Sequence, residues 1–227
     1  IHFVSNKEAK NRVLQLGENP NSIRIIGSPD IDILKSKKLK SLNEVQKRYN
    51  ITFGKKYAIA IFHPVTTDIE NLGFYINQYV NALIESHQNY IVILPNNDLG
   101  SSRIIEEYRR LKDFPRFKLF PSIRFEYFIV LLKNASYIIG NSSCGIIEAP
   151  VYGVPTINVG NRQNNRTKHK EILHCSEITE NEIKLKIEEA KTIKIDPINN
   201  FGTGKSNYKF LAAIEDQHFG ESMCQNN

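Results

Sequence analysis

Cysteines and long apolar runs are both scarce in this sequence. Its 227 residues include only three cysteines, Cys144, Cys175 and Cys224, which are too few and too scattered for a disulfide framework or a zinc site. Reduced thiols of this kind are typical of cytoplasmic proteins. The longest apolar runs, Ile91–Leu94 and Ile129–Leu132, fall far short of the roughly 20 residues that a transmembrane helix needs. The sequence therefore predicts a cytoplasmic protein with no membrane span.

The first residues of the sequence show no pattern that predicts a secretory leader. The chain opens on Ile1, its one methionine is Met223, and no charged segment followed by an apolar run precedes a small-residue cleavage site. Hydrophobic residues make up 41% and charged residues 24%, which excludes the disordered and fibrous classes. At about 150 residues per domain, the length predicts one large domain with a tail or two small domains. We expect a globular chain cut from a longer protein.

The excess of positive charge is modest. Thirty basic residues against 24 acidic ones give a net charge of +6, a balance that can indicate a nucleic-acid partner. Much of the excess lies within residues 35–40 and 184–194, on segments typical of solvated helix faces or linkers with few aromatic residues between the charges. We therefore expect no nucleic-acid partner.

Short apolar segments alternate with longer amphipathic segments along almost the whole chain. This alternation predicts an α/β fold, a Rossmann-like parallel sheet with helices on both faces. The predicted strands are Ile1–Val4, Ile23–Ile26, Tyr57–Phe62, Tyr90–Leu94, Phe117–Phe120, Tyr137–Ile139 and Thr156–Val159. The predicted helices are Lys7–Leu16, Leu72–Ser86, Arg103–Leu111, Phe125–Asn134, Gly145–Val151, Glu182–Ala190 and Ser206–Glu215. The charged stretch around Lys35–Lys47 is expected to link an opening piece to a main unit that starts near Tyr57.

Small and polar residues follow almost every predicted strand. They occupy residues 27–29, 63–67, 95–98, 121–124, 140–145 and 160–163. Because ligands of open α/β sheets bind beyond the carboxyl ends of the strands, we expect these segments to form a binding rim. Turn chemistry alone predicts the glycines, prolines, asparagines and serines, but it does not predict His63 or Arg162.

Residues 140–145, Gly-Asn-Ser-Ser-Cys-Gly, form the strongest local motif. A strand ends, two hydroxyls follow and a helix begins, an arrangement that suits a phosphate group through hydroxyl and backbone N–H donors. Ser142 or Ser143 can equally serve as an ordinary helix cap. Glu148, further along the same helix, suits the hydroxyls of a ribose, or is an acid placed favourably near the start of the helix.

His63 and Arg162 are the candidate polar side chains at two other strand ends. A histidine there suits hydrogen bonding to a phosphate oxygen or proton transfer, but a structural histidine bonded to a loop carbonyl fits equally well. Arg162 suits a phosphate or a base, and is otherwise an ordinary loop arginine. The sequence has no metal-ligand cluster and no dinucleotide glycine fingerprint, so we expect no cofactor.

Taken together, four segments closely resemble the UDP-N-acetylglucosamine 2-epimerases. They are His63–Thr67, Gly140–Gly145, Gly153–Asn158 and Gly160–Gln163, and the resemblance runs in order from about residue 2 to residue 214. It is closest to the hydrolysing branch, which makes N-acetylmannosamine and UDP for sialic acid synthesis. The non-hydrolysing branch typically carries an Arg-rich segment after the histidine and an Asp-Ser-Gly-Gly stretch in place of residues 141–144.

The resemblance implies an enzyme of the glycosyltransferase-B type, with two Rossmann-like domains and the substrate in the cleft between them. This chain would be the C-terminal UDP-binding domain, with an opening segment 1–50, a main unit 51–195 and a final helix and tail 196–227, and without the N-terminal domain. By the same resemblance, the UDP contacts fall on His63, Asn96, Ile123, Ser142, Ser143, Glu148 and Arg162. The serines would meet the pyrophosphate, Glu148 the ribose and the Ile123 backbone the uracil, and His63 is the one catalytic candidate.

The family reaction is understood as elimination of UDP to give a glucal, followed by addition of water with inversion at C2. The candidate base carboxylates belong to the absent domain, so we expect this chain to bind UDP without turning over substrate, and the full-length enzyme to form a homo-oligomer. A UDP-sugar glycosyltransferase of the same fold, a non-hydrolysing epimerase and a non-enzymatic nucleotide-sugar sensor remain alternatives.

Overall fold

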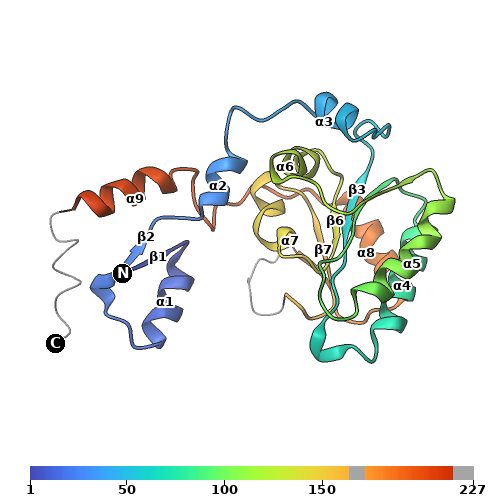
Figure 1. Ribbon diagram of the computed structural model, residues 1–227, viewed down its shortest axis with the longest axis horizontal. Helices are drawn as coiled ribbons and strands as arrows, with labels where there is room; N and C mark the ends of the chain where they lie inside the picture. The colour runs from blue at the N-terminus through green and yellow to red at the C-terminus, as the bar shows by residue number, and fades with distance from the viewer. Residues whose placement is uncertain (164–171, 217–227) are drawn as a thin grey trace. The chain divides into compact units, whose positions relative to one another are not determined.

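The computed structural model describes residues 1–163 and 172–216, and Cys224 lies outside them. The chain divides into two compact units (Figure 1). One consists of residues 1–38 together with the segment from residue 198 onward, and the larger one of residues 39–197. Among the described residues, none of the helices combines the length and the hydrophobicity that a membrane crossing requires.

The larger unit contains a six-stranded parallel sheet with the strand order β5-β4-β3-β6-β7-β8. The strands are β3 (Ala58–Ile61), β4 (Tyr90–Ile93), β5 (Phe117–Phe120), β6 (Ile138–Gly140), β7 (Thr156–Val159) and β8 (Ile172–Cys175). In the central register, Ile59 pairs with Ile91 on one side and with Ile138 on the other. The predicted strands of this unit are confirmed, with ends that shift by at most one residue, whereas β8 was not predicted.

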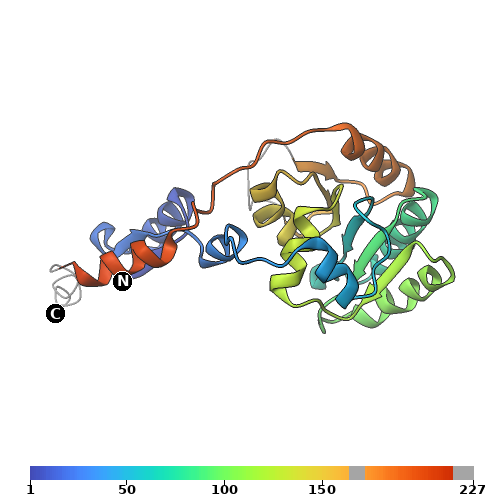
Figure 2. The ribbon, with the colours of Figure 1, turned by 90° about the horizontal axis from the view of Figure 1, so that it is seen from above.

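Helices cover both faces of this sheet, as Figures 1 and 2 show. One face carries α4 (Leu72–Glu85), α5 (Ser101–Tyr108) and α8 (Glu180–Thr192), and α5 continues into the 3₁₀ helix η3 (Arg109–Asp113). The other face carries α3 (Leu42–Arg48), α6 (Phe125–Lys133) and α7 (Cys144–Ile147), and α7 is followed by η4 (Ala149–Tyr152). A further short 3₁₀ helix, η2 (Thr66–Asp68), precedes α4. The predicted fold class is confirmed.

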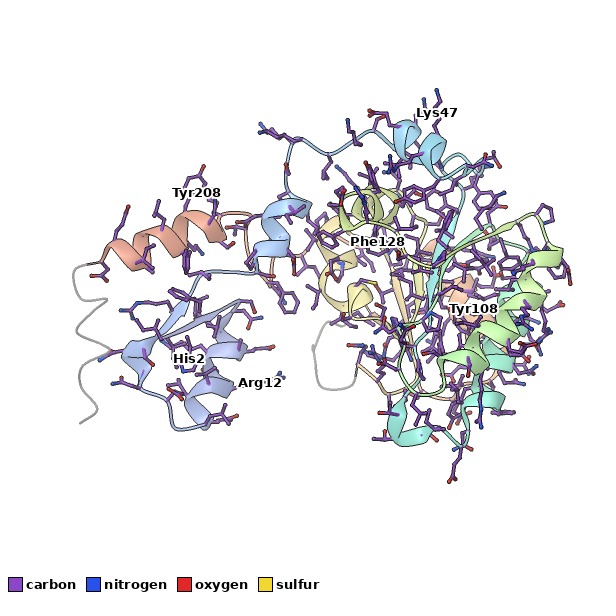
Figure 3. All side chains as sticks on the ribbon, viewed as in Figure 1. His2, Arg12, Lys47, Tyr108, Phe128 and Tyr208 are labelled. Carbon is purple, nitrogen blue, oxygen red and sulfur yellow. The ribbon has the colours of Figure 1, made fainter. Side chains whose placement is uncertain are left out.

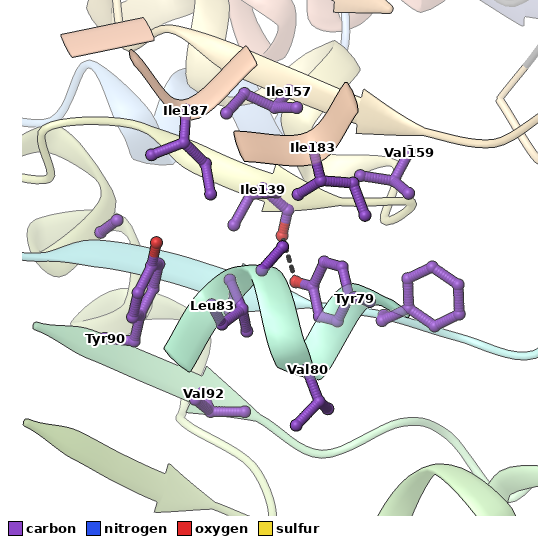
Figure 4. Close-up of a cluster of buried hydrophobic side chains, with 14 of the residues drawn as sticks. Tyr79, Val80, Leu83, Tyr90, Val92, Ile139, Ile157, Val159, Ile183 and Ile187 are labelled. Carbon is purple, nitrogen blue, oxygen red and sulfur yellow. Dashed lines mark hydrogen bonds between the residues drawn. The ribbon is translucent and has the colours of Figure 1, made fainter. Parts of the chain in front are cut away.

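The main core lies between the sheet and the α4–α8 face. Figure 4 shows Leu83 of α4 and Ile183 and Ile187 of α8 packed toward strand residues such as Ile139. Two buried tyrosines bond to the backbone: the Tyr57 hydroxyl donates to the carbonyl of Leu131 at 2.7 Å, and the Tyr79 hydroxyl donates to the carbonyl of Ile139 at 3.0 Å. Strands that are buried on both faces explain why their sequences are almost continuously apolar.

The smaller unit pairs β1 (His2–Val4) with β2 (Ile23–Ile25) in parallel. Its helices are α1 (Lys7–Gln15), the 3₁₀ helix η1 (Pro20–Ser22), α2 (Pro29–Leu34) and α9 (Ser206–Glu215). The Asp32 carboxylate accepts hydrogen bonds from the backbone N–H and hydroxyl of Ser206 and from the N–H of Asn207, and it thereby caps α9 from α2. Figure 3 shows Tyr208 projecting from α9, and its side chain is exposed.

The charged stretch around Lys35–Lys47 is not only a linker, because α3 forms within it. A capping box starts this helix: the Ser41 hydroxyl accepts from the N–H of Glu44 while the Glu44 carboxylate accepts from the N–H of Ser41. Val45 is the one buried residue of α3, so the helix lacks the apolar periodicity on which the prediction relied.

Candidate functional site

The two central strands, β3 and β6, lie side by side but continue onto opposite faces of the sheet. After β3 the chain enters α4 on one face, and after β6 it enters α7 on the other. Such a divergence is the topological switch point of an open α/β sheet, where a crevice forms outside the carboxyl ends of the strands. The segments that open at this point begin with His63 and Asn141, two residues that the sequence places on the predicted rim.

Gly140 brings the ends of these two strands exceptionally close. Its backbone adopts φ +135°, and a Cβ atom there would lie 1.8 Å from the carbonyl oxygen of Ile61. The next residue, Asn141, donates its backbone N–H to that same carbonyl at 3.1 Å. A residue with a side chain at position 140 would therefore separate β3 from β6, and only glycine fits.

The Asn141 side chain clasps the backbone of His63. Its Oδ1 accepts from the His63 N–H at 2.7 Å, and its Nδ2 donates to the His63 carbonyl at 2.8 Å. Asn141 is only 1% exposed, so both bonds are sheltered from water. This clasp fixes the start of the β3–α4 connection against the β6–α7 connection.

The backbone carbonyl of Asn141 accepts hydrogen bonds from a third connection, the one that follows β7. It accepts from Nη1 of Arg162 at 3.1 Å and from Nε2 of Gln163 at 2.8 Å. The predicted site residues His63 and Arg162 are thus brought together through Asn141. Asn141 belongs to the predicted rim but was not among the predicted site residues. Nothing in the spacing of the sequence indicates that one amide meets two other loops.

His63 is a buried and neutral imidazole. Its Nδ1 accepts the backbone N–H of Asn96 at 3.3 Å, so the proton of the neutral ring resides on Nε2. Burial and the positive charge of Arg162 lower the pKa of His63 to about 4, against a smaller opposing effect of Asp98. At neutral pH the ring is therefore an uncharged hydrogen-bond donor through Nε2. Asn96, also predicted for the site, is exposed and contributes this backbone contact.

Ser142 and Ser143 lie directly after the clasp, and neither hydroxyl caps α7. Ser143 occupies the N-cap position without a side-chain cap bond, which argues against a simple capping role. The Ser142 hydroxyl accepts from Sγ of Cys144 at 3.2 Å, which leaves its own proton available to a ligand. Burial raises the pKa of the Cys144 thiol to about 12, so the thiol keeps the proton that it donates.

The α-helix predicted over Gly145–Val151 is longer than the α-helix in the structure, α7. The α-helix ends at Ile147, and the chain tightens into the 3₁₀ helix η4, where the N–H of Val151 bonds to the carbonyl of Glu148. Pro150 causes the change, because proline lacks the N–H that an α-helix needs at that position. Glu148 is therefore at the end of α7, half-buried and electrostatically coupled to Cys144.

Ile123 is placed apart from the other candidates. It is half-buried on the connection between β5 and α6, and β4 separates β5 from β3 in the sheet. It shares the carboxyl-end rim with His63, but among the described residues no hydrogen bond joins it to the clasp. A ligand that reaches both positions must extend along the rim across two neighbouring strands.

A cavity of about 390 Å³ opens beside Asn141 on the α4–α8 side of the rim. It was not predicted from the sequence, because the β8–α8 connection that closes it follows the strand that the prediction missed. Its walls combine carboxylates, amides, hydroxyls and aromatic rings: Phe62, Val65, Asp68, Leu72, Phe74, Tyr75, Asn141, Val159, Gly160, Asn161, Ser176, Glu177, Ile178 and Thr179. Within residues 1–163 and 172–216, no group of three His, Cys, Asp or Glu side chains is arranged to hold a metal ion.

Comparison with known protein families gives the site its context. The family profile of UDP-N-acetylglucosamine 2-epimerase matches residues 1–215. The chain belongs to this family. The family resemblance predicted from the rim motifs is thereby confirmed.

Two curated relatives of the chain illustrate its position in the family. It is 49% identical over 181 residues to a UDP-N-acetylglucosamine 2-epimerase of Neisseria meningitidis serogroup B, covering 80% of this chain and 48% of that protein. It is 29% identical over 217 residues to the hydrolyzing UDP-N,N'-diacetylbacillosamine 2-epimerase of Legionella pneumophila, covering 94% of this chain and 57% of that protein. The chain thus spans about half the length of the curated relatives it matches.

Solved structures of family members share the fold. The UDP-GlcNAc 2-epimerase of Methanocaldococcus jannaschii, solved in complex with UDP-GlcNAc and UDP, superimposes with a TM-score of 0.72 at 18% sequence identity. The match covers 94% of this chain and 60% of that one. At this level of identity the comparison establishes the fold.

Proposed function

We propose that this chain is the UDP-binding, C-terminal part of a hydrolysing UDP-N-acetylglucosamine 2-epimerase, which converts UDP-GlcNAc into N-acetylmannosamine and UDP. The observation that carries the proposal is the Asn141 clasp. It holds neutral His63, positively charged Arg162 and the serine pair that follows it at the switch point of the sheet. Uncharged and cationic donors that converge on one crevice suit a pyrophosphate group.

UDP would extend along the rim from β6 to β5. The hydroxyls of Ser142 and Ser143 would donate to the pyrophosphate, Glu148 would accept from the ribose hydroxyls, and the backbone near Ile123 would meet the uracil. Asn96 would border the nucleotide through its contact with His63. The M. jannaschii relative, which has the same fold, was solved with UDP-GlcNAc and UDP.

The chemistry proposed for the first step is elimination. A base removes the proton from C2 of the sugar, the C1–O bond breaks, its electron pair leaves with UDP, and a glucal remains; water then adds across the double bond. As the bond breaks, negative charge develops on the β-phosphate, where Nε2–H of His63 and the Arg162 guanidinium would stabilise it. A neutral histidine suits this role because it donates without having to lose a proton.

The base that removes the C2 proton is not assigned to this chain. The resemblance places the candidate carboxylates in an N-terminal domain, and the chain spans about half the length of its curated relatives. We therefore expect this chain to bind UDP without catalysing turnover. The proposal also includes a homo-oligomeric, cytoplasmic full-length enzyme, which light scattering and cell fractionation of that enzyme would test.

Titration calorimetry of this chain with UDP tests the nucleotide site. We expect saturable binding that Ser143→Ala and Glu148→Ala each weaken tenfold or more, because each removes a hydrogen bond to a charged or desolvated group. Ser102→Ala, an exposed serine on α5, is the matched control and should leave the affinity unchanged. A folded chain that does not bind UDP would overturn the proposed site.

The branch of the family is decided by the product. The Legionella relative is named as a hydrolyzing enzyme, which supports release of a free sugar. Incubation of the full-length enzyme with UDP-GlcNAc should give free N-acetylmannosamine. UDP-N-acetylmannosamine would instead indicate the non-hydrolysing branch, and transfer of the sugar to an acceptor would indicate a glycosyltransferase.

A further inference from the structure

The cavity beside Asn141 lies outside the set of contacts proposed for UDP, because none of the residues proposed to contact UDP is among the residues that line it. Its volume of about 390 Å³ is at the lower end of the range typical of small-molecule sites, so it suits a single ring better than a whole nucleotide sugar. The cavity opens at Asn141, whose side chain bonds to His63 and whose carbonyl accepts from Arg162. A ligand in the cavity would therefore lie next to the groups proposed to bind the pyrophosphate.

The wall of this cavity carries negative charge. Asp68 and Glu177 contribute carboxylates from two different connections, and the described residues that line the cavity include no lysine, arginine or histidine. A phosphate or carboxylate group in the cavity would be repelled by these acids and would find no cation to pair with. The cavity therefore excludes anionic groups, whereas the neighbouring rim holds the guanidinium of Arg162.

Two aromatic rings at the start of α4 give the cavity an apolar side. The ring centroids of Phe74 and Tyr75 are 6.1 Å apart, and Phe74 leaves 57% of its surface exposed. A sugar ring has hydroxyls that need hydrogen-bond partners and a C–H face that packs against aromatic rings. A wall that combines carboxylates, amides and hydroxyls with aromatic rings satisfies both needs.

The β8–α8 connection, which forms one wall of the cavity, is held from two sides. The Glu182 carboxylate accepts from the N–H groups of Ser176 and Glu177 at 3.2 and 2.8 Å. The N–H of Glu180 donates to Oε1 of Gln78 on α4 at 2.9 Å. Within the described part of the chain, no hydrogen bond or ion pair engages the Glu177 carboxylate, so it is available to a ligand. A wall fixed in this way needs little reorganisation on binding.

We infer that this cavity is a subsite for a neutral, hydroxyl-rich sugar ring. The carboxylates of Asp68 and Glu177 would accept hydrogen bonds from the sugar hydroxyls, and Phe74 would pack against the C–H face. The ring has two possible sources, which are the sugar group of a nucleotide sugar bound at the rim and a free sugar. The first source rests on the proposed function, whereas the cavity itself is defined by residues of this chain.

The first test needs no nucleotide. The chain is labelled with a nitrogen isotope, and the NMR signals of the amides of Gly160, Ile178 and Thr179 at the cavity are followed during titration with N-acetylglucosamine and N-acetylmannosamine. Saturable shifts of these signals are the result expected for a free sugar. Glucosamine, which carries an ammonium group instead of the acetamide, should bind more weakly. Tighter binding of glucosamine that Glu177→Gln abolishes would show a cation site and overturn the inference.

The second test compares UDP-GlcNAc with UDP. If the sugar group enters the cavity, UDP-GlcNAc should shift the cavity amides and UDP should not. In titration calorimetry, Phe74→Ala and Glu177→Gln should each weaken UDP-GlcNAc binding about fivefold or more and leave the Kd of UDP within twofold. Asp68→Asn should act in the same direction, but Asp68 also accepts from Nδ2 of Asn71 at 2.7 Å, so its effect counts only where Glu177→Gln reproduces it.

The matched controls are exposed residues away from the cavity. Asp113→Asn changes an exposed aspartate that precedes β5, at the opposite edge of the sheet from the rim. Tyr208→Ala removes an exposed aromatic ring from α9. Both variants should bind each ligand as the wild type does. Circular dichroism checks that all variants fold, and Phe74 and Glu177 are exposed, so their substitution leaves the core intact.

The outcomes separate this inference from the proposed function. If the wild type binds a free sugar at the cavity amides but does not bind UDP, the subsite stands and the proposed function fails. If the wild type binds UDP, but neither UDP-GlcNAc nor a free sugar shifts the cavity amides, the proposed nucleotide site stands and the inference is wrong. Shifts that Phe74→Ala and Glu177→Gln leave unchanged would also overturn it.

Discussion

His63 makes the stability of the larger unit depend on pH in a way that one substitution can isolate. The side chain is 7% exposed, and burial together with Arg162 lowers its pKa from 6.5 to about 4. The folded protein therefore resists protonation of this ring, whereas the unfolded chain accepts the proton near pH 6.5. His63→Gln removes the titration and keeps an amide N–H of similar reach.

The sign and size of the effect follow from linkage. Above pH 6.5 the ring is neutral in the folded and the unfolded state, so it does not change the free energy of unfolding. As the pH falls from 6.5 toward 4, the unfolded chain binds the proton first, and the free energy of unfolding decreases. A difference between 6.5 and about 4, at about 1.4 kcal/mol for each pKa unit, corresponds to roughly 3 kcal/mol once the pH is below 4. At pH 5, about 2 kcal/mol of this should already be lost.

Urea unfolding of both proteins at pH 8, 6.5 and 5 measures the effect. Carboxylates contribute equally to the two proteins, so the wild-type free energy of unfolding minus that of His63→Gln should decrease by about 2 kcal/mol between pH 8 and pH 5. His87→Asn, at an exposed histidine after α4, is the control and should follow the wild type. A difference between wild type and His63→Gln that is constant with pH would refute the neutral, buried histidine.

Three further substitutions probe other parts of the structure. Gly140→Ala should lower the free energy of unfolding by about 4 kcal/mol or more, because its Cβ would lie 1.8 Å from the carbonyl oxygen of Ile61; a loss below about 1 kcal/mol in urea unfolding would contradict the close approach. Tyr137→Phe removes a 2.7 Å hydrogen bond to the buried Tyr90 hydroxyl and should cost about 1 kcal/mol in the same assay, and no loss would mean that the pair is not formed. Asp32→Ala removes three hydrogen bonds at the start of α9, and the first amides of α9 should exchange with deuterium at least tenfold faster; unchanged exchange would show that this cap is dispensable.

The central sheet was predictable because its strands are buried on both faces and their apolar runs stand out between polar turns. The elements that were missed have weak burial signals for specific reasons. In the strand β8, the exposed His174 interrupts the apolar run. The helix α3 buries one residue, Val45, so its capping box was a better signal than its periodicity. The predicted length of α7 was wrong because the prediction followed the helical periodicity of the sequence and gave too little weight to Pro150.

The candidate site was predictable to the level of the strand ends and no further. The rule that ligands bind beyond the carboxyl ends of parallel strands places His63, Asn96 and Arg162 on one rim, and the structure brings these three together. That UDP binds there stays a prediction. The neutral state of His63 could not be read from the sequence, because it depends on burial and on a guanidinium 99 positions along the chain.

Asn141 shows why the connections within the rim escape sequence reasoning. Its partners after β3 and after β7, His63 and Gln163, are 78 and 22 residues away, and they meet because β6 lies between β3 and β7 in the sheet. Strand order is set by how helices pack on the two faces, not by any local motif. Once that order is known, Gly140 and Asn141 have a joint role. The glycine lets β3 and β6 approach closely, and the Asn141 amide can then reach the backbone of His63. A site assembled in this way depends on the sheet order as much as on its polar residues, so a substitution that separates β3 from β6 should disable the rim even where every candidate side chain is retained.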